Sequence, residues 1–127
     1  MLNALHHVAI ICTDYERSRR FYVGTLGLEL IREVYREERQ SWKADLQIGA
    51  SQLELFSFPA PAVRPSYPEA TGLRHLAFSV ADLDIVVVRL RTAGVAVESI
   101  RLDPHTGQRF TFFSDPDGLP LELYESR

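Results

Sequence analysis

Two histidines and two glutamates recur along the chain in a pattern that could bind a metal ion. His7 and His75 lie 68 residues apart, and Glu54 and Glu122 have the same separation. Neutral imidazole nitrogens and anionic carboxylate oxygens together suit a divalent first-row metal. A buried carboxylate needs a cation or its own neutralisation, which a shared ion would supply. The pattern predicts one divalent ion (nickel, cobalt, zinc, manganese or iron) held by these four residues.

Each of these residues also has a plainer interpretation. A histidine on a strand is more often a hydrogen-bonded core or edge residue than a ligand. A Leu-Glu-Leu stretch is usually an amphipathic strand with a solvated glutamate. The common separation of the two pairs favours the metal site. Cys12 is the single cysteine, which excludes a thiolate zinc cluster, so we expect five or six coordination completed by water.

The elements that position these residues form a tandem repeat. Each half predicts one strand, one helix and three further strands, from alternating apolar residues and turn signals. Asp14 and Asp82 are the predicted N-caps of helices over 15–27 and 83–94. The predicted strands cover 5–12, 29–36, 41–49, 52–58, 74–80, 96–101, 108–114 and 119–124. The fold class is therefore α+β, with two tandem βαβββ modules.

Four prolines separate the two halves, at positions within "FPAPAVRPSYPEATG". This composition excludes a helix or a central strand and is typical of an extended connector. We predict a single domain over 1–127, with module 1 at about 1–58, the connector at 59–72 and module 2 at about 73–127.

Charge and composition indicate which binding partners and which cellular location to expect. The formal net charge is -3, and no basic block appears, which argues against nucleic acid and anionic membranes as partners. No apolar run approaches the roughly 20 residues of a membrane-spanning helix. The N-terminal residues do not resemble a signal peptide, and one cysteine suits a reducing compartment. We expect a cytoplasmic protein with a small-molecule substrate.

At the four predicted ligands the chain resembles the vicinal oxygen chelate (VOC) superfamily, which includes glyoxalase I, bleomycin resistance proteins and extradiol dioxygenases. The matching segments are "HHVAIICTDYERSRRFYVGTLGLEL", "LELF", "LRHLAFSVADLD" and "DPDGLPLELYE", and they span nearly the whole chain. "RPSYPEATGLRHLAFSV" and "RFTFFSDPDGLPLELYE" are similar to the small bacterial YaeR-like branch. The resemblance implies a cup-shaped mixed sheet around the metal, a homodimer, and the same four ligands.

The order His-Glu-His-Glu resembles the glyoxalase I arrangement. Glyoxalase I enzymes of this kind commonly carry an arginine and an asparagine that hold glutathione, where this chain has Ile11 and Phe58. The resemblance therefore implies a metal-dependent lyase or isomerase that moves a proton next to a carbonyl of a small vicinal-oxygen substrate, not a glutathione adduct. It implies Glu122 as the catalytic base, with Glu54 as the rival.

Two other functions stay open. One is a ferrous-iron dioxygenase of the same superfamily, and the other is a non-catalytic protein that binds a small molecule and confers resistance. Further candidate substrate contacts are Ile11 and, as walls of the pocket, Trp42 and Phe58, although core packing would also explain the two aromatic residues. Arg39, Lys43 and Arg109 could bind an acidic substrate, although surface charge is the alternative for each.

Overall fold

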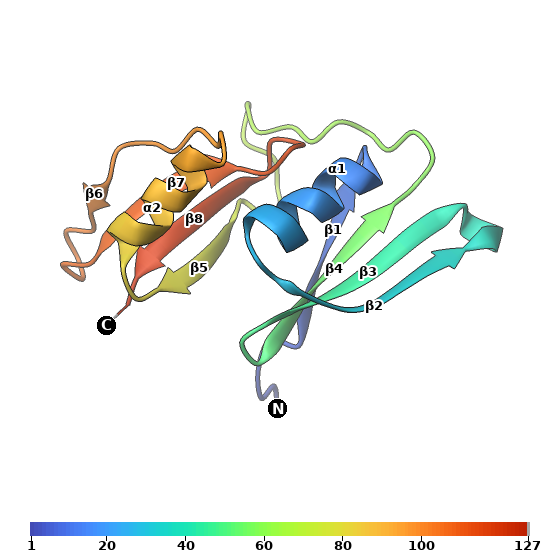
Figure 1. Cartoon of the computed structure of the whole chain (residues 1–127), viewed down its shortest axis with the longest axis horizontal. Helices are drawn as coiled ribbons and strands as arrows, with labels where there is room; N and C mark the ends of the chain where they lie inside the picture. Colours follow the sequence, from blue (N-terminus) through green and yellow to red (C-terminus); the bar gives the residue numbers. More distant parts are fainter. Residues whose placement is uncertain (127) are drawn as a thin grey trace. The chain divides into compact units, whose positions relative to one another are not determined.

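The computed structural model describes residues 1–126. The chain divides into two compact units, Met1–Val63 (unit 1) and Arg64–Arg127 (unit 2), so the division falls inside the predicted connector. Each unit contains one four-stranded mixed sheet with a helix against one face (Figure 1). No helix within residues 1–126 has the length and apolar character needed to cross a bilayer.

The sheet of unit 1 has the strand order β1-β4-β3-β2. β1 runs parallel to β4, and the other neighbours are antiparallel. The strands are β1 (His7–Cys12), β2 (Glu29–Arg36), β3 (Ser41–Ile48) and β4 (Ser51–Ser57). The helical segments are α1 (Tyr15–Arg19), the π-helix η1 (Arg20–Thr25) and the 3-10 turn η2 (Glu37–Arg39).

Alternation along β4 separates the core of unit 1 from a polar face. Leu53 and Leu55 are buried toward the helix with Leu46 and Tyr22, and these apolar side chains supply the burial that stabilises the unit. Because successive side chains of a strand point to opposite faces, Glu54 lies on the other face of the sheet.

Unit 2 repeats this arrangement with the strand order β5-β8-β7-β6. Its elements are β5 (Leu76–Val80), α2 (Leu83–Thr92), β6 (Arg101–Leu102), β7 (Arg109–Ser114) and β8 (Pro120–Glu125). Leu83 and Val87 of α2 are buried with Leu121 and Leu123 of β8. Glu122, between these two leucines, therefore lies on the face away from the helix.

The predicted α+β fold of two βαβββ modules is confirmed, and both aspartate caps are present. Asp14 accepts a hydrogen bond from the backbone N–H of Arg17 at 3.1 Å, and Asp82 accepts one from Ile85 at 3.2 Å. These caps satisfy N–H groups that the first helical turn leaves without a partner.

Two predicted elements were wrong in detail. The helix expected over 15–27 is α-helical only to Arg19, and its continuation widens to a π-helix in which Leu26 donates to the carbonyl of Phe21 at 2.9 Å. The strand expected over 96–101 is reduced to β6. Before β6, the Glu98 N–H donates to the Phe112 carbonyl at 3.0 Å, and the Thr111 hydroxyl donates to the Glu98 carbonyl at 2.8 Å.

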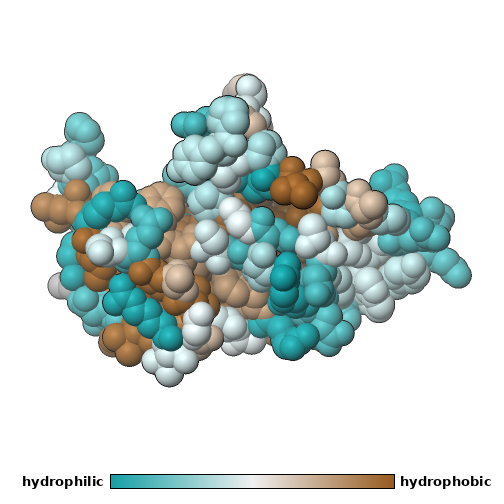
Figure 2. Space-filling view, turned by 90° about the horizontal axis from the view of Figure 1, so that it is seen from above, coloured by the Kyte–Doolittle hydropathy of each residue, from teal (hydrophilic) through white to brown (hydrophobic). Residues whose placement is uncertain are grey.

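The surface of the protein mixes hydrophilic and hydrophobic side chains (Figure 2). In unit 2, Ile85 and Val88 of α2 and Leu102 of β6 are all more than half exposed. Ile85 and Val88 are three residues apart on one helix and therefore share a side of it. Unit 2 therefore has three large apolar side chains that are not covered by the rest of the described chain.

Candidate functional site

The first His–Glu pair lies on the sheet of unit 1. β1 and β4 are in register with Ala9 opposite Glu54, and His7 shares the face of Ala9 because it lies two residues earlier. His7 Nε2 is 3.5 Å from Glu54 Oε2. The histidine side chain is 43% exposed and the glutamate only 14%. The pair therefore joins an accessible imidazole to a carboxylate that is mostly shielded from water.

The second pair occupies the equivalent place in unit 2. Ala77 is opposite Glu122, and His75 lies two residues before Ala77. His75 Nε2 is 2.9 Å from Glu122 Oε2, and the side chains are 33% and 13% exposed. The His75 ring also meets Phe112 edge-on, with ring centroids 5.0 Å apart. The repeat thus produces the same imidazole–carboxylate contact twice.

Within residues 1–126, no three His, Cys, Asp or Glu side chains gather as a metal-binding group. Each unit taken by itself contributes two donors. His6 adds a contact that sequence reasoning missed: its Nδ1 lies 2.9 Å from His7 Nδ1. Since the side chains of neighbouring strand residues alternate, the HH dipeptide alone did not indicate that the two rings meet.

Charged side chains surround Glu54 on its face of unit 1. Lys43 Nζ is 3.9 Å from Glu54 Oε1 and 3.2 Å from Asp45 Oδ1, and Arg32 Nε is 3.0 Å from Asp45 Oδ2. Burial alone would raise the pKa of Asp45, but hydrogen bonds and charge from Arg32 and Lys43 outweigh it and hold the pKa below its usual value. Lys43, one of the predicted substrate contacts, therefore lies next to a predicted metal ligand.

An apolar surface adjoins the same face. Ile11 shares the face of His7 and is 55% exposed. Phe56 and Phe58 stack with centroids 5.9 Å apart, and the guanidinium carbon of Arg36 lies 4.9 Å and 5.8 Å from their centroids. Ile11 and Phe58, two predicted substrate contacts, thus lie on or beside the face that carries His7 and Glu54.

Unit 2 contains a pocket of about 500 Å³ that includes His75 in its lining. Arg74 and Arg101 bring two guanidinium groups to this pocket, and Tyr67 and Phe112 bring aromatic rings. Neither arginine was predicted as a site residue. The only sequence signal was the position of Arg74 directly before His75.

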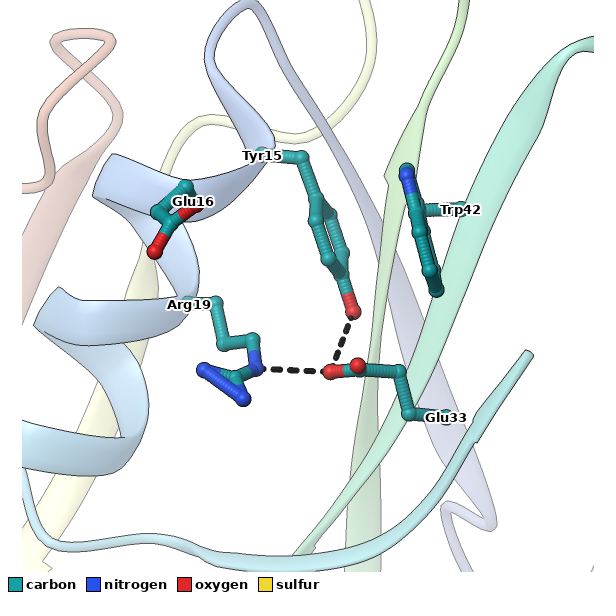
Figure 3. Close-up of a pocket in the computed structure, with 5 residues that line it drawn as sticks. All are labelled: Tyr15, Glu16, Arg19, Glu33 and Trp42. Atoms are coloured by element: carbon teal, nitrogen blue, oxygen red, sulfur yellow. Dashed lines mark hydrogen bonds and ion pairs between the residues drawn. The ribbon is translucent and has the colours of Figure 1, made fainter. Parts of the chain in front are cut away.

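A second cavity, of about 260 Å³, lies on the helix side of unit 1 (Figure 3). Glu33 accepts hydrogen bonds from the Tyr15 hydroxyl at 2.9 Å and from Arg19 Nε at 2.6 Å, and the Tyr15 and Trp42 rings stack with centroids 5.4 Å apart. Burial, and then the hydrogen bond to the Glu33 carboxylate, raise the pKa of Tyr15 well above its usual value.

Trp42, for which core packing was the alternative to a pocket wall, lines this cavity. Asp45 is opposite Glu54, so Lys43 and Asp45 share the Glu54 face while Trp42 lies on the helix face. The indole therefore packs against Tyr15 rather than beside the predicted metal ligands.

The other two predicted basic contacts lie elsewhere. Arg109 is on the helix face of unit 2, where Nη2 is 2.8 Å from Asp84 Oδ2 and 2.9 Å from the buried Glu125 Oε2. Both carboxylates raise the pKa of Arg109, so this side chain is engaged as a structural ion pair. Arg39 is exposed in η2. We include neither residue in the proposed site.

Comparison with known proteins places the chain in a family. The profile of the glyoxalase/bleomycin resistance protein/dioxygenase superfamily matches residues 4–123. The uncharacterised protein YaeR of Escherichia coli is 61% identical over 125 residues, which cover 98% of this chain and 97% of YaeR. The crystal structure of SMU.1112c superposes with a TM-score of 0.96 at 48% identity, covering 98% of this chain and all of that one.

Relatives with named activities cover several kinds of chemistry. A 2-epi-5-epi-valiolone epimerase from Actinomyces sp. is 32% identical over 142 residues, covering 94% of this chain and 78% of the epimerase. More distant relatives include a probable lactoylglutathione lyase, a catechol-2,3-dioxygenase and the glutathione transferase FosA. Members of the superfamily typically bind a divalent metal and are often dimeric. From the extent of the profile match and the identity to YaeR, this chain belongs to the glyoxalase/bleomycin resistance protein/dioxygenase superfamily, within its YaeR-like branch.

Proposed function

We propose that this protein is a metal-dependent lyase or isomerase that transfers a proton next to a carbonyl of a small substrate with vicinal oxygens. The proposed ligands of its single divalent ion are His7, Glu54, His75 and Glu122. The observation that carries this proposal is the duplicated contact, His7 with Glu54 and His75 with Glu122, at equivalent positions of the two units.

The donor chemistry fits such an ion. Each pair presents an imidazole Nε2 and a carboxylate oxygen at one spot, and both glutamates are mostly shielded from water. Shielded carboxylates favour a cationic partner. Two nitrogens and two oxygens without thiolate suit nickel, cobalt, zinc, manganese or iron. When bound, such an ion supplies Lewis-acid polarisation of substrate oxygens.

The surroundings of the two glutamates favour Glu122 as the base. Lys43 Nζ lies 3.9 Å from Glu54 Oε1, so an ammonium group already occupies one side of this carboxylate. Glu122 pairs with His75, and the neighbouring side chain is the apolar Phe112. We therefore propose that Glu122 accepts the proton from the substrate carbon at a carboxylate oxygen and returns it to the adjacent carbon. Glu54 is proposed as a ligand.

The residues beside the first pair support a substrate other than a glutathione adduct. Ile11 is exposed on the His7 face, and Phe58 stacks on Phe56. Apolar groups at these places offer no hydrogen bond to the carboxylates or amides of a peptide thiol. An epimerase among the relatives supports proton transfer on a substrate without that thiol.

We further propose that the protein acts as a homodimer in the cytoplasm. Apolar side chains of unit 2, Ile85, Val88 and Leu102, remain exposed and would be covered in an interface. The four ligands then belong either to one chain or to two chains of the dimer. Sedimentation or light scattering with and without metal distinguishes monomer from dimer.

The test of the metal site is a titration of metal-free protein with nickel, cobalt and zinc, followed by elemental analysis. We expect one tightly bound ion per set of four ligands, and a large loss of affinity in His75→Ala and Glu54→Gln. His105→Ala is the matched control, because His105 is an exposed loop histidine. Equal binding by the wild type, His75→Ala and Glu54→Gln would contradict the proposed ligand set.

The test of the base uses Glu122→Gln loaded with metal, in a screen of α-keto aldehydes, 2-oxo acids and epimerisable ketones in deuterated water. We expect wild-type protein to exchange the proton next to the carbonyl and Glu122→Gln to lose this exchange. A wild-type protein that binds ferrous iron and consumes oxygen stoichiometrically with a catechol would instead favour the dioxygenase function, which one relative carries.

A further inference from the structure

We infer that the pocket of unit 2 binds the anionic group of a small organic substrate, a carboxylate or a phosphate, through Arg74 and Arg101. This inference rests on the proposed function and adds the charge class of the substrate. The pocket has a volume of about 500 Å³ and lies entirely within unit 2. Its lining includes His75, so a bound anion would sit beside one of the proposed metal ligands.

The charges of the pocket favour an anion. Two guanidinium groups, Arg74 and Arg101, line it together with one carboxylate, Glu98. Arg101 Nη2 donates to Glu98 Oε1 at 3.0 Å, so this carboxylate offsets one of the two cations. Within residues 1–126, Arg74 forms no ion pair with a carboxylate. One positive charge is left for a ligand to neutralise.

Arg101 is held in place by rings rather than by burial. Its guanidinium carbon lies 5.0 Å from the Phe110 centroid and 5.5 Å from the Phe112 centroid. Stacking on aromatic rings fixes the plane of the guanidinium while leaving its edge free to donate. The side chain is 50% exposed, and Nε and Nη1 make no hydrogen bond in the part of the chain that the structure describes. The Nε–H and Nη1–H groups point to different sides of the guanidinium, and each can donate a hydrogen bond to an oxygen of a carboxylate or a phosphate.

Arg74 is fixed by the segment that precedes β5. Nη1 donates to the Ser66 carbonyl at 3.0 Å, and the guanidinium carbon lies 5.2 Å from the Tyr67 centroid. Arg64 in turn donates to the Leu73 and Arg74 carbonyls at 3.1 Å and 3.0 Å. These contacts hold the guanidinium at the pocket without neutralising it. A preorganised cation loses little conformational entropy when an anion binds.

Unit 1 shows that this cationic pocket is not a general consequence of the fold. The strand positions that face Glu54 there carry Asp45 and, two residues earlier, Lys43. In unit 2 the corresponding neighbours of Glu122 are Phe112 and Phe110. Where unit 1 has the ion pair of Lys43 with Asp45, unit 2 has two aromatic rings. The guanidinium group of Arg101 stacks on these rings. Unit 2 is therefore built for a ligand with one flat or apolar part and one anionic part.

The test measures binding of three probes of similar shape to the full-length, metal-free protein by calorimetry. Benzoate and phenyl phosphate carry the two candidate anions, and benzyl alcohol is the neutral control. We expect at least one of the two anions to bind, with an affinity that falls as the salt concentration is raised. Benzyl alcohol should bind at least tenfold more weakly than that anion. The preferred anion identifies the group that the substrate carries. Equal binding of benzyl alcohol would overturn the inference.

Variants assign the binding to the two arginines. Arg101→Gln and Arg74→Gln should each weaken anion binding about tenfold or more, whereas Arg89→Gln, on the exposed part of α2, should leave it unchanged. Circular dichroism checks that each variant is folded. If Arg101→Gln and Arg74→Gln bind the anions as well as the wild type does, the pocket is not the anion site.

Metal binding separates the failure of this inference from that of the proposed function. The anion measurements use metal-free protein, so they do not depend on whether the four proposed ligands hold an ion. Arg101→Gln should bind nickel as the wild type does. Anion binding without any metal binding would support the anion pocket and reject the metal-dependent function. Metal binding without anion binding that depends on the two arginines would support the metal-dependent function and reject the anion pocket.

Discussion

The Nδ1 atoms of His6 and His7 lie 2.9 Å apart, and the two rings meet edge to face. One of these nitrogens must carry a proton and the other must accept it. His7 directs its other nitrogen, Nε2, toward Glu54. His6 therefore occupies the place of a group that fixes the orientation and the tautomer of a proposed ligand.

This contact predicts that His6 is a positioning residue. His6→Phe keeps the ring and removes the hydrogen bond, and we expect metal affinity to fall about tenfold, the lower end of the effect of such outer partners. The affinity is measured by competition with a chromophoric chelator. His6→Asn should recover part of the loss because an amide can hydrogen-bond to His7. If His6→Phe binds metal as tightly as the wild type, the contact has no role in the site.

Lys43 is expected to oppose metal binding. Its ammonium group lies 3.9 Å from Glu54 and competes with a metal cation for the same carboxylate. Lys43→Gln should raise the affinity for nickel or zinc several-fold, with a smaller gain at high salt. Arg32→Gln is the control, since Arg32 pairs with Asp45 and not with Glu54. A weaker site in Lys43→Gln would mean that the lysine is needed to orient Glu54.

The sequence predicted the two His–Glu pairs for a physical reason. Side chains of a strand alternate, and the Leu-Glu-Leu pattern requires each glutamate to face away from the core, while residues two apart on β1 and β5 return to the same face. These rules place each histidine and its glutamate on the face away from the core, and the parallel pairing of β1 with β4 and of β5 with β8 then brings them together. The family resemblance identified the same residues.

The features that could not be predicted depend on contacts between distant residues. The anchoring of Arg101 depends on rings of β7, and that of Arg74 depends on the backbone at Ser66. Alternation within β3 puts Trp42 on the face opposite to Lys43. Only the pairing of β3 with β4, in which Asp45 is opposite Glu54, shows that the Trp42 face is the helix face. Arg109 looked available because its partners, Asp84 and Glu125, lie on a helix and another strand.

Tyr15 predicts a loss of stability in alkali. Burial and the Glu33 carboxylate raise the pKa of Tyr15 in the folded protein above the usual value of 10.0. The unfolded chain therefore releases this proton at a lower pH than the folded protein does. The stability contributed by Tyr15 is complete below pH 10.0 and falls as the pH rises above that value.

The measurement is the ultraviolet absorbance of phenolate during an alkaline titration. Tyr15 should ionise well above the usual value, and Tyr15→Phe should show one late-ionising tyrosine fewer than the wild type. The free energy of unfolding of Tyr15→Phe, measured in urea, should also vary less with pH above 10.0 than that of the wild type. Tyr67→Phe is the control, because Tyr67 is exposed and its ring lies in unit 2. A late phenolate signal of unchanged amplitude in Tyr15→Phe would contradict the assignment.

Arg109 is expected to stabilise the fold and to leave the site unaffected. Its guanidinium donates from Nε and Nη2 to the buried Glu125, which also accepts the backbone N–H of Leu83 at the start of α2. Arg109→Gln removes both of these hydrogen bonds from the guanidinium to the buried carboxylate, so the free energy of unfolding in urea should fall more than in Arg101→Gln. Arg101→Gln, whose partner Glu98 is solvent-exposed, should change this free energy by less than about 1 kcal/mol.

Metal stoichiometry and benzoate binding of Arg109→Gln should match the wild type at temperatures where the variant is folded. A loss of either without a loss of stability would restore Arg109 as a substrate contact.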